Sequence, residues 1–430
     1  MSNALIELKL GLYMHKATSP TAAALLKVER FGVMESGTLS YGRQFINNQN
    51  MRFHPDPALA KPVNLLSPQR MRDGGALPPY LKDALPDSWG RLVLMAANPG
   101  ITPDDYVVLS MTNEYRIGAV VVMDSPYLPS TQPPLSLQDL YTMAMAVQYG
   151  RDVPLDVRRL LTQGGSLGGA RPKASIYDDG ALWLAKFPLR EDAFDYQIAE
   201  AGTLELATMC GIQASTARCV VLHHATVLMT KRFDRIPSPD GEQRIHFLSA
   251  AGLLNVDYES GQGTYVELAH AISRFGAAPK EDCRELFRRM IFNILIDNTD
   301  DHVKNHGFLH TGDNKYRLAP AYDIHPQGTH LQYMGMPLVN DLTTPSIRQI
   351  VDEAHHFHLN TFEAELIILQ LITKISGNWR KVFTQAGMTD QDIQYLAKVL
   401  NPLHERWQAM HAEFIATPAQ KILGKGEQGR

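Results

Sequence analysis

Apolar and polar positions alternate at the start of the chain. Ile6, Leu8, Leu10 and Leu12 are separated by more polar residues and one glycine, and this period of two predicts a half-buried β-strand. Further short strands are expected at 24–28, 38–45 and 119–123, because glycine, proline and asparagine separate these runs. The first 135 or so residues are therefore predicted to form mainly strands and turns, and a proline-rich link at 126–134 marks their end.

In the middle of the chain, segments with the helical period of about 3.6 residues alternate with segments that have the strand period of two. Helices are predicted at 137–147 and 155–161, and a glycine-rich run, GGSLGG, follows at 164–169. Two strands at 173–177 and 182–187 are joined by the turn Asp178-Asp179-Gly180, a strong hairpin signal. A helix is expected at 195–209, with Gly211 as its stop, and another strand at 225–233.

From about residue 280 the pattern becomes helical. Leu286, Phe287, Met290, Ile291 and Ile294 fall on one face of a helix. After a predicted hairpin at 307–319, further helices are expected at 345–357, 361–375, 390–400 and 403–416, and residues 423–430 should form a frayed tail. The chain is therefore predicted to be an α+β protein of two lobes, strand-rich first and all-helical second, with a cleft between them.

Composition narrows the class of protein. The 430 residues are 44% hydrophobic and 20% charged, with a net charge of -4, which excludes disorder for most of the chain and argues against a basic nucleic-acid clamp. Because no apolar run approaches 18 residues and no basic-then-apolar leader is present, we expect neither a membrane span nor a signal peptide. Three cysteines without a CxxC spacing indicate reduced thiols. A cytoplasmic enzyme or partner-binding protein is expected.

The densest polar run is DNTDDHVKNH at 297–306, followed by the hairpin and then by PAYD at 320–323. Phosphoryl transfer needs a carboxylate near the attacking hydroxyl and oxygen ligands for magnesium. An Asp, an Asn five residues later, a hairpin and a second Asp form the order that protein kinases use. Asp300 would then orient or deprotonate the hydroxyl, and Asn305 and Asp323 would bind magnesium.

Two other interpretations of this run stay open. Asp, Asn and His are common in solvated loops, so the run could be purely structural. His302, His306 and His310 recur at intervals of four and could serve a metal hydrolase. Gly307 and the turn at 312–314 argue against the continuous helix that would align the three rings.

The glycine-rich run is the second chemical signal. Four glycines in six positions let a backbone approach an anion closely, although the run does not match the Walker pattern GxxxxGK[ST]. Lys186 follows on an apolar strand, where a lysine is costly unless it meets negative charge. A phosphate and Glu200, on the next helix, are the expected partners. Lys186 could otherwise be an edge-strand lysine whose amine reaches solvent.

Several motifs occur in order: SLGGARPK at 166–173, KFP at 186–188, RFDR at 232–235, NTDDHVKN at 298–305 and LAPAYD at 318–323. Together they resemble the HipA family of bacterial toxin kinases. LPPYL at 77–81 and LPDSWGR at 85–91 are similar to the N-terminal region of that family. The resemblance spans motifs from about residue 70 to residue 330.

The resemblance implies a bilobal protein-kinase-like fold and a set of site residues. It divides the chain into an N-terminal subdomain (1–135), an ATP-binding part with the glycine-rich loop (136–235) and a helical lobe with the catalytic and metal-binding loops (236–430). It implies Asp300 as the catalytic residue, Asn305 and Asp323 as magnesium ligands, and Ser166 as an autophosphorylation site that silences the kinase. It also implies an adenine hinge at 230–233. The residues implied to bind the nucleotide are Ser166, Gly168, Gly169, Ala170, Lys186, Glu200, Lys231, Phe233, Asp234, His302, Lys304, Asn305 and Asp323.

The resemblance further implies an ATP- and Mg²⁺-dependent serine/threonine kinase that acts as the toxin of a toxin–antitoxin pair. Its protein substrate would be a translation component such as an aminoacyl-tRNA synthetase, so that its activity would arrest growth and favour persistence. A small DNA-binding antitoxin would neutralise it and supply most of the DNA contact. The alternatives are a catalytically silent kinase fold that acts as a co-repressor, or a small-molecule phosphotransferase.

Overall fold

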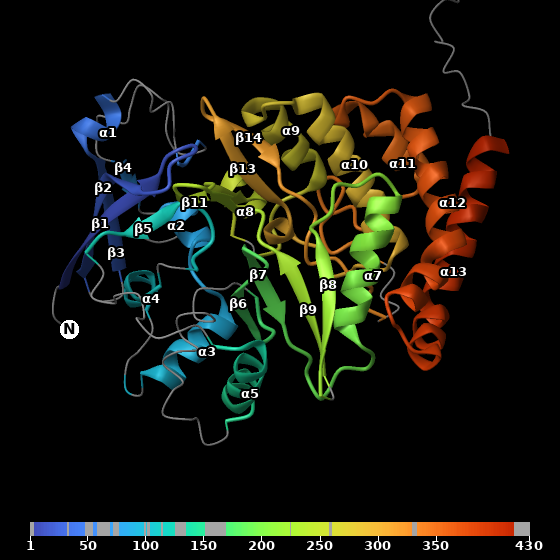
Figure 1. The fold of residues 1–430 in the computed structure, drawn as a ribbon. Helices are drawn as coiled ribbons and strands as arrows, with labels where there is room; N and C mark the ends of the chain where they lie inside the picture. Colours follow the sequence, from blue (N-terminus) through green and yellow to red (C-terminus); the bar gives the residue numbers. More distant parts are fainter. Residues whose placement is uncertain are drawn as a thin grey trace, which may run out of the picture.

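The computed structural model describes residues 4–31, 34–47, 55–57, 69–71, 77–98, 100, 104–112, 115–124, 135–150, 169–223, 225–257, 260–328 and 333–416. Strands dominate the first half of the chain and helices the second, with the two sheets of the first half on one side and the long C-terminal helices on the other (Figure 1). This is the expected two-lobed α+β arrangement. Within the described ranges, no helix has the length and apolarity needed to cross a bilayer.

The N-terminal sheet has five strands in the order β4-β3-β2-β1-β5, all antiparallel. Leu8, Leu10 and Leu12 are buried on one of its faces, as the alternating pattern predicts. The strand expected at 38–45 is wrong in its last residues, because the strand ends at Tyr41 and a short helix follows. The strands are β1 (Ala4–Tyr13), β2 (Pro20–Phe31), β3 (Met34–Tyr41), β4 (Gln69–Met71) and β5 (Val120–Val122).

Among the described residues before 112, four helices occur, and the sequence pattern missed them. They are α1 (Arg43–Asn47), α2 (Pro79–Asp83), α3 (Ser88–Ala97) and α4 (Asp105–Met111). Three of them have seven residues or fewer, too short for a clear period. α3 contains Gly90, which weakens a helix pattern, yet the helix forms because Trp89, Val93 and Leu94 pack in the core.

The second sheet has the order β6-β7-β9-β8 and is antiparallel throughout. The predicted hairpin is confirmed, with Asp179 and Gly180 both at positive φ between its strands. The helix predicted at 137–147 is α5, whereas the one predicted at 155–161 lies outside the described residues. The elements are α5 (Leu137–Gln148), β6 (Lys173–Asp178), β7 (Ala181–Lys186), β8 (Ala217–Leu222) and β9 (Ala225–Lys231).

Helix α7 (Tyr196–Met209) connects this sheet to the helical half. Asp195 caps its N-terminus by accepting a hydrogen bond from the Ile198 amide, and Gly211 follows its end at positive φ. The helix packs against α12 (Thr361–Gln385), where a Cβ atom at Gly202 would lie 2.8 Å from a ring carbon of Phe383. Glycine therefore permits the close approach of the two helices.

The remaining elements build the second lobe. It is not all-helical as expected, because it also holds a three-stranded sheet, β12-β13-β14, and a two-stranded β10-β11 ribbon. The predicted hairpin at 307–319 supplies two strands of that sheet. The elements are β10 (Arg235–Ser238), β11 (Gly241–Arg244), β12 (Phe247–Ser249), α8 (Ala250–Leu254), α9 (Tyr265–Phe275), α10 (Pro279–Leu295), η3 (Val303–Asn305), β13 (Gly307–Gly312), β14 (Lys315–Leu318), α11 (Ile347–Asp352), η4 (Ala354–Phe357) and α13 (Asp390–Ala416).

All four helix predictions near the C-terminus need correction. The helix predicted at 345–357 is divided into α11 and the 3-10 helix η4. α12 is ten residues longer than expected, and the helices predicted at 390–400 and 403–416 form the single helix α13 with Pro402 inside. A proline removes one backbone hydrogen bond. The buried face runs through it from Leu396 and Leu400 to Trp407, and the His404 ring bonds to the carbonyl of Leu295 at 2.8 Å. Packing on both sides outweighs the break.

A buried ionic network joins the N-terminal segment around residue 116 to the chain after β9. Asp234 has no exposed surface. It accepts hydrogen bonds from both Nε and Nη2 of Arg232 at 2.7 Å, from Arg235 at 2.6 Å and from the Gly118 amide at 2.8 Å. The two arginines also donate to the carbonyl oxygen of Arg116. The network therefore fixes the ends of two distant segments against each other.

We predict that Asp234→Asn strongly destabilises the fold. Burial raises the pKa of Asp234, but the two arginine charges outweigh it and hold that pKa well below its ordinary value. Removing the charge leaves the buried guanidinium of Arg232 without its carboxylate and that of Arg235 with Glu242 alone, a loss of roughly 3–5 kcal/mol. Urea unfolding of wild type and variant measures this loss in unfolding free energy.

Asp179→Asn is the matched control, because its side chain is 76% exposed beside Arg218 and such a pair contributes less than about 1 kcal/mol. Equal losses of unfolding free energy in the two variants would contradict the role of the buried network.

Candidate active site

A buried lysine lies at the centre of the candidate site. Lys186, the last residue of β7, contacts both carboxylate oxygens of Glu200 on α7 at 2.8 Å. Its Nζ also lies 2.6 Å from Oδ1 of Asp323. The side chains of Lys186 and Glu200 are 11% and 5% exposed, whereas that of Asp323 is 43% exposed. The expected Lys186–Glu200 pair is confirmed, and Asp323 joins it from the other half of the chain.

The local fold explains why Asp323 reaches the lysine. Ala321 pairs with the segment before β8, since its amide donates to Gln213 and its carbonyl accepts from Ser215. Two residues later, Asp323 has a φ of +55°, a conformation that aspartate tolerates better than most residues. Backbone strain of this kind is frequent at functional sites.

The charges of the three groups depend on one another. Burial lowers the pKa of Lys186, but Asp323 and Glu200 outweigh that effect, so its pKa lies above the ordinary value. Burial likewise favours neutral Asp323, yet Lys186 and Lys173 hold its pKa well below the usual range. Lys186 and Asp323 are therefore both charged at neutral pH.

Lys173 is a second buried lysine beside the first. It lies directly opposite Lys186 in the β6–β7 ladder and is 7% exposed. Like charges at opposite positions of a strand pair are destabilising. Burial is the largest effect on the pKa of Lys173 and lowers it, as does Lys186, while Asp323, Asp87 and Glu200 raise it; the resulting pKa is about 8. The two lysines form a surface that suits an anion.

The loop at 300–305 has a compact internal structure. The His302 side chain caps the short helix η3 by accepting from the Lys304 amide, and the Asn305 amide nitrogen donates to the carbonyl of Asp300 at 3.3 Å. Tyr322 braces this loop by donating from its hydroxyl to the carbonyl of Lys304 at 2.6 Å. Asp300 is exposed, so its carboxylate is accessible to a hydroxyl group.

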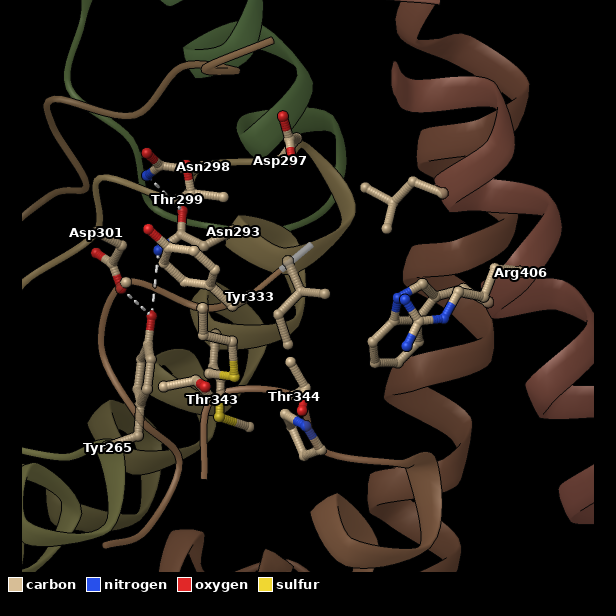
Figure 2. A pocket seen from close by; sticks show the side chains of 17 residues that line it. Tyr265, Asn293, Asp297, Asn298, Thr299, Asp301, Tyr333, Thr343, Thr344 and Arg406 are labelled. Carbon is tan, nitrogen blue, oxygen red and sulfur yellow. Dashed lines mark hydrogen bonds between the residues drawn. The ribbon is translucent and has the colours of Figure 1, made fainter. Parts of the chain in front are cut away.

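Buried polar groups also hold the loop at 300–305 in place through Asp301. Asp301 is 3% exposed and accepts from the hydroxyl of Tyr265, while Nε2 of His306 lies 3.0 Å from its other oxygen. Asn293 donates to the Tyr265 hydroxyl at 3.2 Å, and Figure 2 shows this chain of contacts beneath the loop. Burial raises the pKa of Asp301, but His306 and Tyr265 hold it below its ordinary value.

A pocket lies along the loop at 297–301. Its empty volume is about 540 Å³, open solvent included. Figure 2 shows Thr299 and Asp301 on one side and Arg406, from α13, on the other. Residues 333–335 and 343–345 also line the pocket. The pocket is therefore adjacent to Asp300 in the chain and open to solvent.

Part of the glycine-rich run lies outside the described residues, including Ser166 and Gly168. Gly169 and Ala170 are described, and Gly169 has a φ of +84°. A Cβ atom at Gly169 would lie 2.3 Å from Nζ of Lys173. The end of the run therefore lies against the lysine pair and requires glycine there.

The hinge residues expected at 230–233, and Asp234, expected near the nucleotide, have different surroundings. Lys231 is exposed, and Phe233 is partly buried with its ring centroid 5.5 Å from that of Tyr322. The expectation for Asp234 needs correction, because all its hydrogen bonds go to protein groups and it has no exposed surface for a nucleotide. Arg232 and Arg235, which flank Asp234 in the sequence, indicate its structural role in a buried ion network.

The three histidines of the metal-hydrolase alternative do not share a site. His302 caps η3, His306 pairs with Asp301, and His310 lies buried on β13 beside Tyr316. Burial lowers the pKa of His310 to about 3. Their different partners disfavour that alternative.

The donors present fit a magnesium ion that arrives with a nucleotide. Among the described residues, no group of three His, Cys, Asp or Glu side chains could hold a metal. Magnesium bound through substrate phosphates needs only one or two protein oxygens. Asp323 offers a partly exposed carboxylate. Asn305 donates from its side-chain nitrogen to the carbonyl of Asp300, and its side-chain oxygen would be the atom that binds magnesium.

Two residues of this site were missed by the sequence reasoning. Lys173 ends the motif at 166–173 and Asp87 lies within the motif at 85–91, so both were inside recognised patterns without an assigned role. Asp87 lies 2.8 Å from Nζ of Lys304. A lysine opening an apolar strand was a usable signal for Lys173, whereas the partner of Asp87 is 217 residues away and no local pattern indicates it.

The fold and the site define a two-lobed, kinase-like protein with a lysine–glutamate–aspartate cluster between its halves. The HipA-like C-terminal domain model matches residues 165–379, half of the chain, and the chain belongs to that family. The match covers Lys173, Lys186 and the loop at 297–306, and it ends within α12.

Known proteins give the same class. The chain is 24% identical to Y4dM and 28% identical to Y4mE of Sinorhizobium fredii, both named as candidate kinases, over 58% and 57% of its length. The matches span 62% and 63% of those relatives. A chain from the Shewanella oneidensis MR-1 complex of HipA, HipB and operator DNA has the same fold, with a TM-score of 0.69, 16% identity and coverage of 95% and 99% of the two chains.

We predict that the effect of Lys173→Met on stability depends on pH. The folded pKa is about 8, and an unfolded lysine titrates near 10.4. Between these values the unfolded state binds more protons, so Lys173 makes the unfolding free energy rise with pH. Relative to wild type, the variant should therefore lose up to about 3 kcal/mol between pH 7.5 and 10.

Urea unfolding at several pH values gives the difference, and exposed Lys398→Met corrects for removing any lysine. A wild-type-minus-variant difference that stays constant across this range would contradict a depressed pKa at Lys173.

Proposed function

We propose that this protein is an ATP- and magnesium-dependent protein kinase that phosphorylates serine or threonine and acts as the toxin of a toxin–antitoxin pair. One observation carries the proposal: Lys186 lies within 2.8 Å of both Glu200 and Asp323. Kinases need a lysine that a helix carboxylate orients toward phosphates, next to an aspartate for the metal.

The other residues supply the remaining parts of the reaction. Lys186, Lys173 and Lys304 would neutralise phosphate charge, and Asn305 and Asp323 would hold magnesium, which polarises the phosphates when bound. Glycine amides near Gly169, with Ser166, Gly168 and Ala170, would line the phosphates. Lys231 and Phe233 would line the adenine, with His302 at the catalytic loop.

Asp300 would act on the attacking hydroxyl. The hydroxyl oxygen bonds to the γ-phosphorus while the bond from that phosphorus to its bridging oxygen breaks and ADP leaves. Asp300 would orient the hydroxyl and accept its proton. Its exposure suits a large substrate.

The biological role rests on the family and its relatives. The structural relative comes from a complex with HipB and operator DNA, which supports a DNA-binding antitoxin as the partner here. With a net charge of -4, this chain is a weak candidate for extensive DNA contact of its own. A translation component such as an aminoacyl-tRNA synthetase is the proposed substrate, and Ser166 the proposed autophosphorylation site.

We predict that Asp300→Asn reduces phosphate transfer by roughly 10²–10⁴-fold, the usual contribution of a general base. Purified protein is incubated with radiolabelled ATP, Mg²⁺ and a cell extract, and labelled proteins are counted after electrophoresis. Asp313→Asn is the control, because it removes an equal charge in the hairpin turn at a φ of +51°, which asparagine tolerates.

Ser166→Ala in the same assay separates autophosphorylation from substrate labelling. Label that persists in this variant and vanishes in Asp300→Asn keeps the kinase and rejects Ser166 as the sole site. Tight ATP binding without any labelled protein would favour the silent-scaffold alternative and overturn the proposal.

A further inference from the structure

Asp87 does not cap the helix that it precedes. Aspartate at the N-cap position of a helix usually accepts a hydrogen bond from the first turn, which contributes about 1 kcal/mol. Asp87 occupies that position for α3 but makes no such bond. Its Oδ1 accepts from Nζ of Lys304 at 2.8 Å, and its Oδ2 accepts from the amide of Gly169 at 2.6 Å. Both oxygens are therefore used in contacts outside α3.

The start of α3 and the end of the glycine-rich run are joined at more than one point. The Trp89 amide donates to the carbonyl of Gly169 at 3.3 Å, and the Trp89 indole donates to the carbonyl of Lys173 at 2.8 Å. Gly169 thus contacts α3 through both its amide and its carbonyl. The contact is a defined junction, to which the N-terminal region contributes Asp87 and Trp89, and Asp87 is the charged one of the two.

The groups that Asp87 engages are those that phosphates need. A backbone amide at the end of a glycine-rich run and a lysine of the catalytic loop are both phosphate donors in the proposed function. Burial raises the pKa of Asp87, but Lys304 and Gly169 hold it below the ordinary value, so the carboxylate is charged at neutral pH. A carboxylate and a phosphate are both anions that only accept hydrogen bonds, and adjacent anions repel.

We propose, on the basis of the proposed function, that Asp87 is an internal competitor of the nucleotide: its carboxylate occupies the donors of Lys304 and Gly169 until phosphates displace it. Lys186 is paired in the same way with Asp323. In the described part of the cleft, three lysines face three carboxylates: Lys173, Lys186 and Lys304 against Asp87, Glu200 and Asp323. A nucleotide must exchange some of these pairs to bind.

The location of Asp87 links nucleotide affinity to the position of α3. The residue belongs to the N-terminal region, whereas Lys304 and Gly169 belong to the two sides of the cleft. Nucleotide affinity therefore depends on where α3 lies, and any ligand that moves α3 away would raise that affinity.

The test uses the full chain and Asp87→Asn. The amide oxygen can still accept from Gly169, but the negative charge is lost. Asp105→Asn is the matched control, because Asp105 anchors the same helix through Arg91 without contacting Lys304 or Gly169. Isothermal titration with Mg·ATP gives the dissociation constant, and amide hydrogen exchange without nucleotide reports on the junction at Gly169.

We expect Asp87→Asn to bind Mg·ATP roughly three- to thirty-fold more tightly than wild type, as removal of one nearby charge permits, while Asp105→Asn stays near wild type. An unchanged or weaker affinity in Asp87→Asn overturns the competition. Weaker phosphate transfer at saturating ATP, without tighter binding, would assign Asp87 a positioning role instead.

Failure of the proposed function is distinguishable from failure of this inference. If neither wild type nor Asp87→Asn binds Mg·ATP, the kinase proposal fails and the competition with it. Faster exchange around Gly169 in Asp87→Asn alone would in that case still establish the junction as a structural contact. Binding in wild type with no gain in the variant rejects only the role of Asp87.

Discussion

A lysine ammonium can remain buried only where negative charge surrounds it, and this constraint organises the molecule. Lys186 ends a central strand with its side chain 11% exposed. Glu200 reaches it because α7 starts at the Asp195 cap and packs along α12. Asp323 reaches it because Ala321 pairs with the segment before β8. Elements from both halves of the chain therefore converge on one ammonium group, since leaving it unpaired would be costly.

Lys173 adds a second positive charge beside Lys186, which indicates a chemical role for the pair. Lys173 faces Lys186 across the strand pair, and a fold under selection for stability alone has no use for that repulsion. Together with Lys304, these side chains give the cleft three cations whose carboxylate partners differ in exposure. Glu200 is 5% exposed, whereas Asp323 is 43% and Asp87 25% exposed. In the proposed kinase, Glu200 would stay with its lysine, while the two more accessible carboxylates would exchange with phosphate and magnesium.

Regular elements with a clear period could be predicted from the sequence. The alternation at Ile6–Leu12 and the buried face of α10 gave the correct strand and helix, and the lysine on an apolar strand followed by a helical glutamate gave the Lys186–Glu200 pair. Features that depend on distant parts of the chain could not be found in this way. Pro402 predicts a helix break, but packing on both sides of it keeps α13 continuous. Gly90 weakens the helical pattern of α3, so the sequence did not predict that helix. Asp234 lies in a recognised motif but has a structural role, which only the buried arginines reveal.

In the proposed kinase, carboxylates around Lys186 exchange for phosphates. The most direct measurement of this exchange is a crystal structure of the protein with Mg²⁺ and a non-hydrolysable ATP analogue. We expect Lys186 to keep Glu200 but to leave Asp323 for a phosphate oxygen, and Asp323 and Asn305 to bind the metal. A nucleotide bound elsewhere, or bound in the cleft with the 2.6 Å contact between Lys186 and Asp323 unchanged, would contradict this exchange.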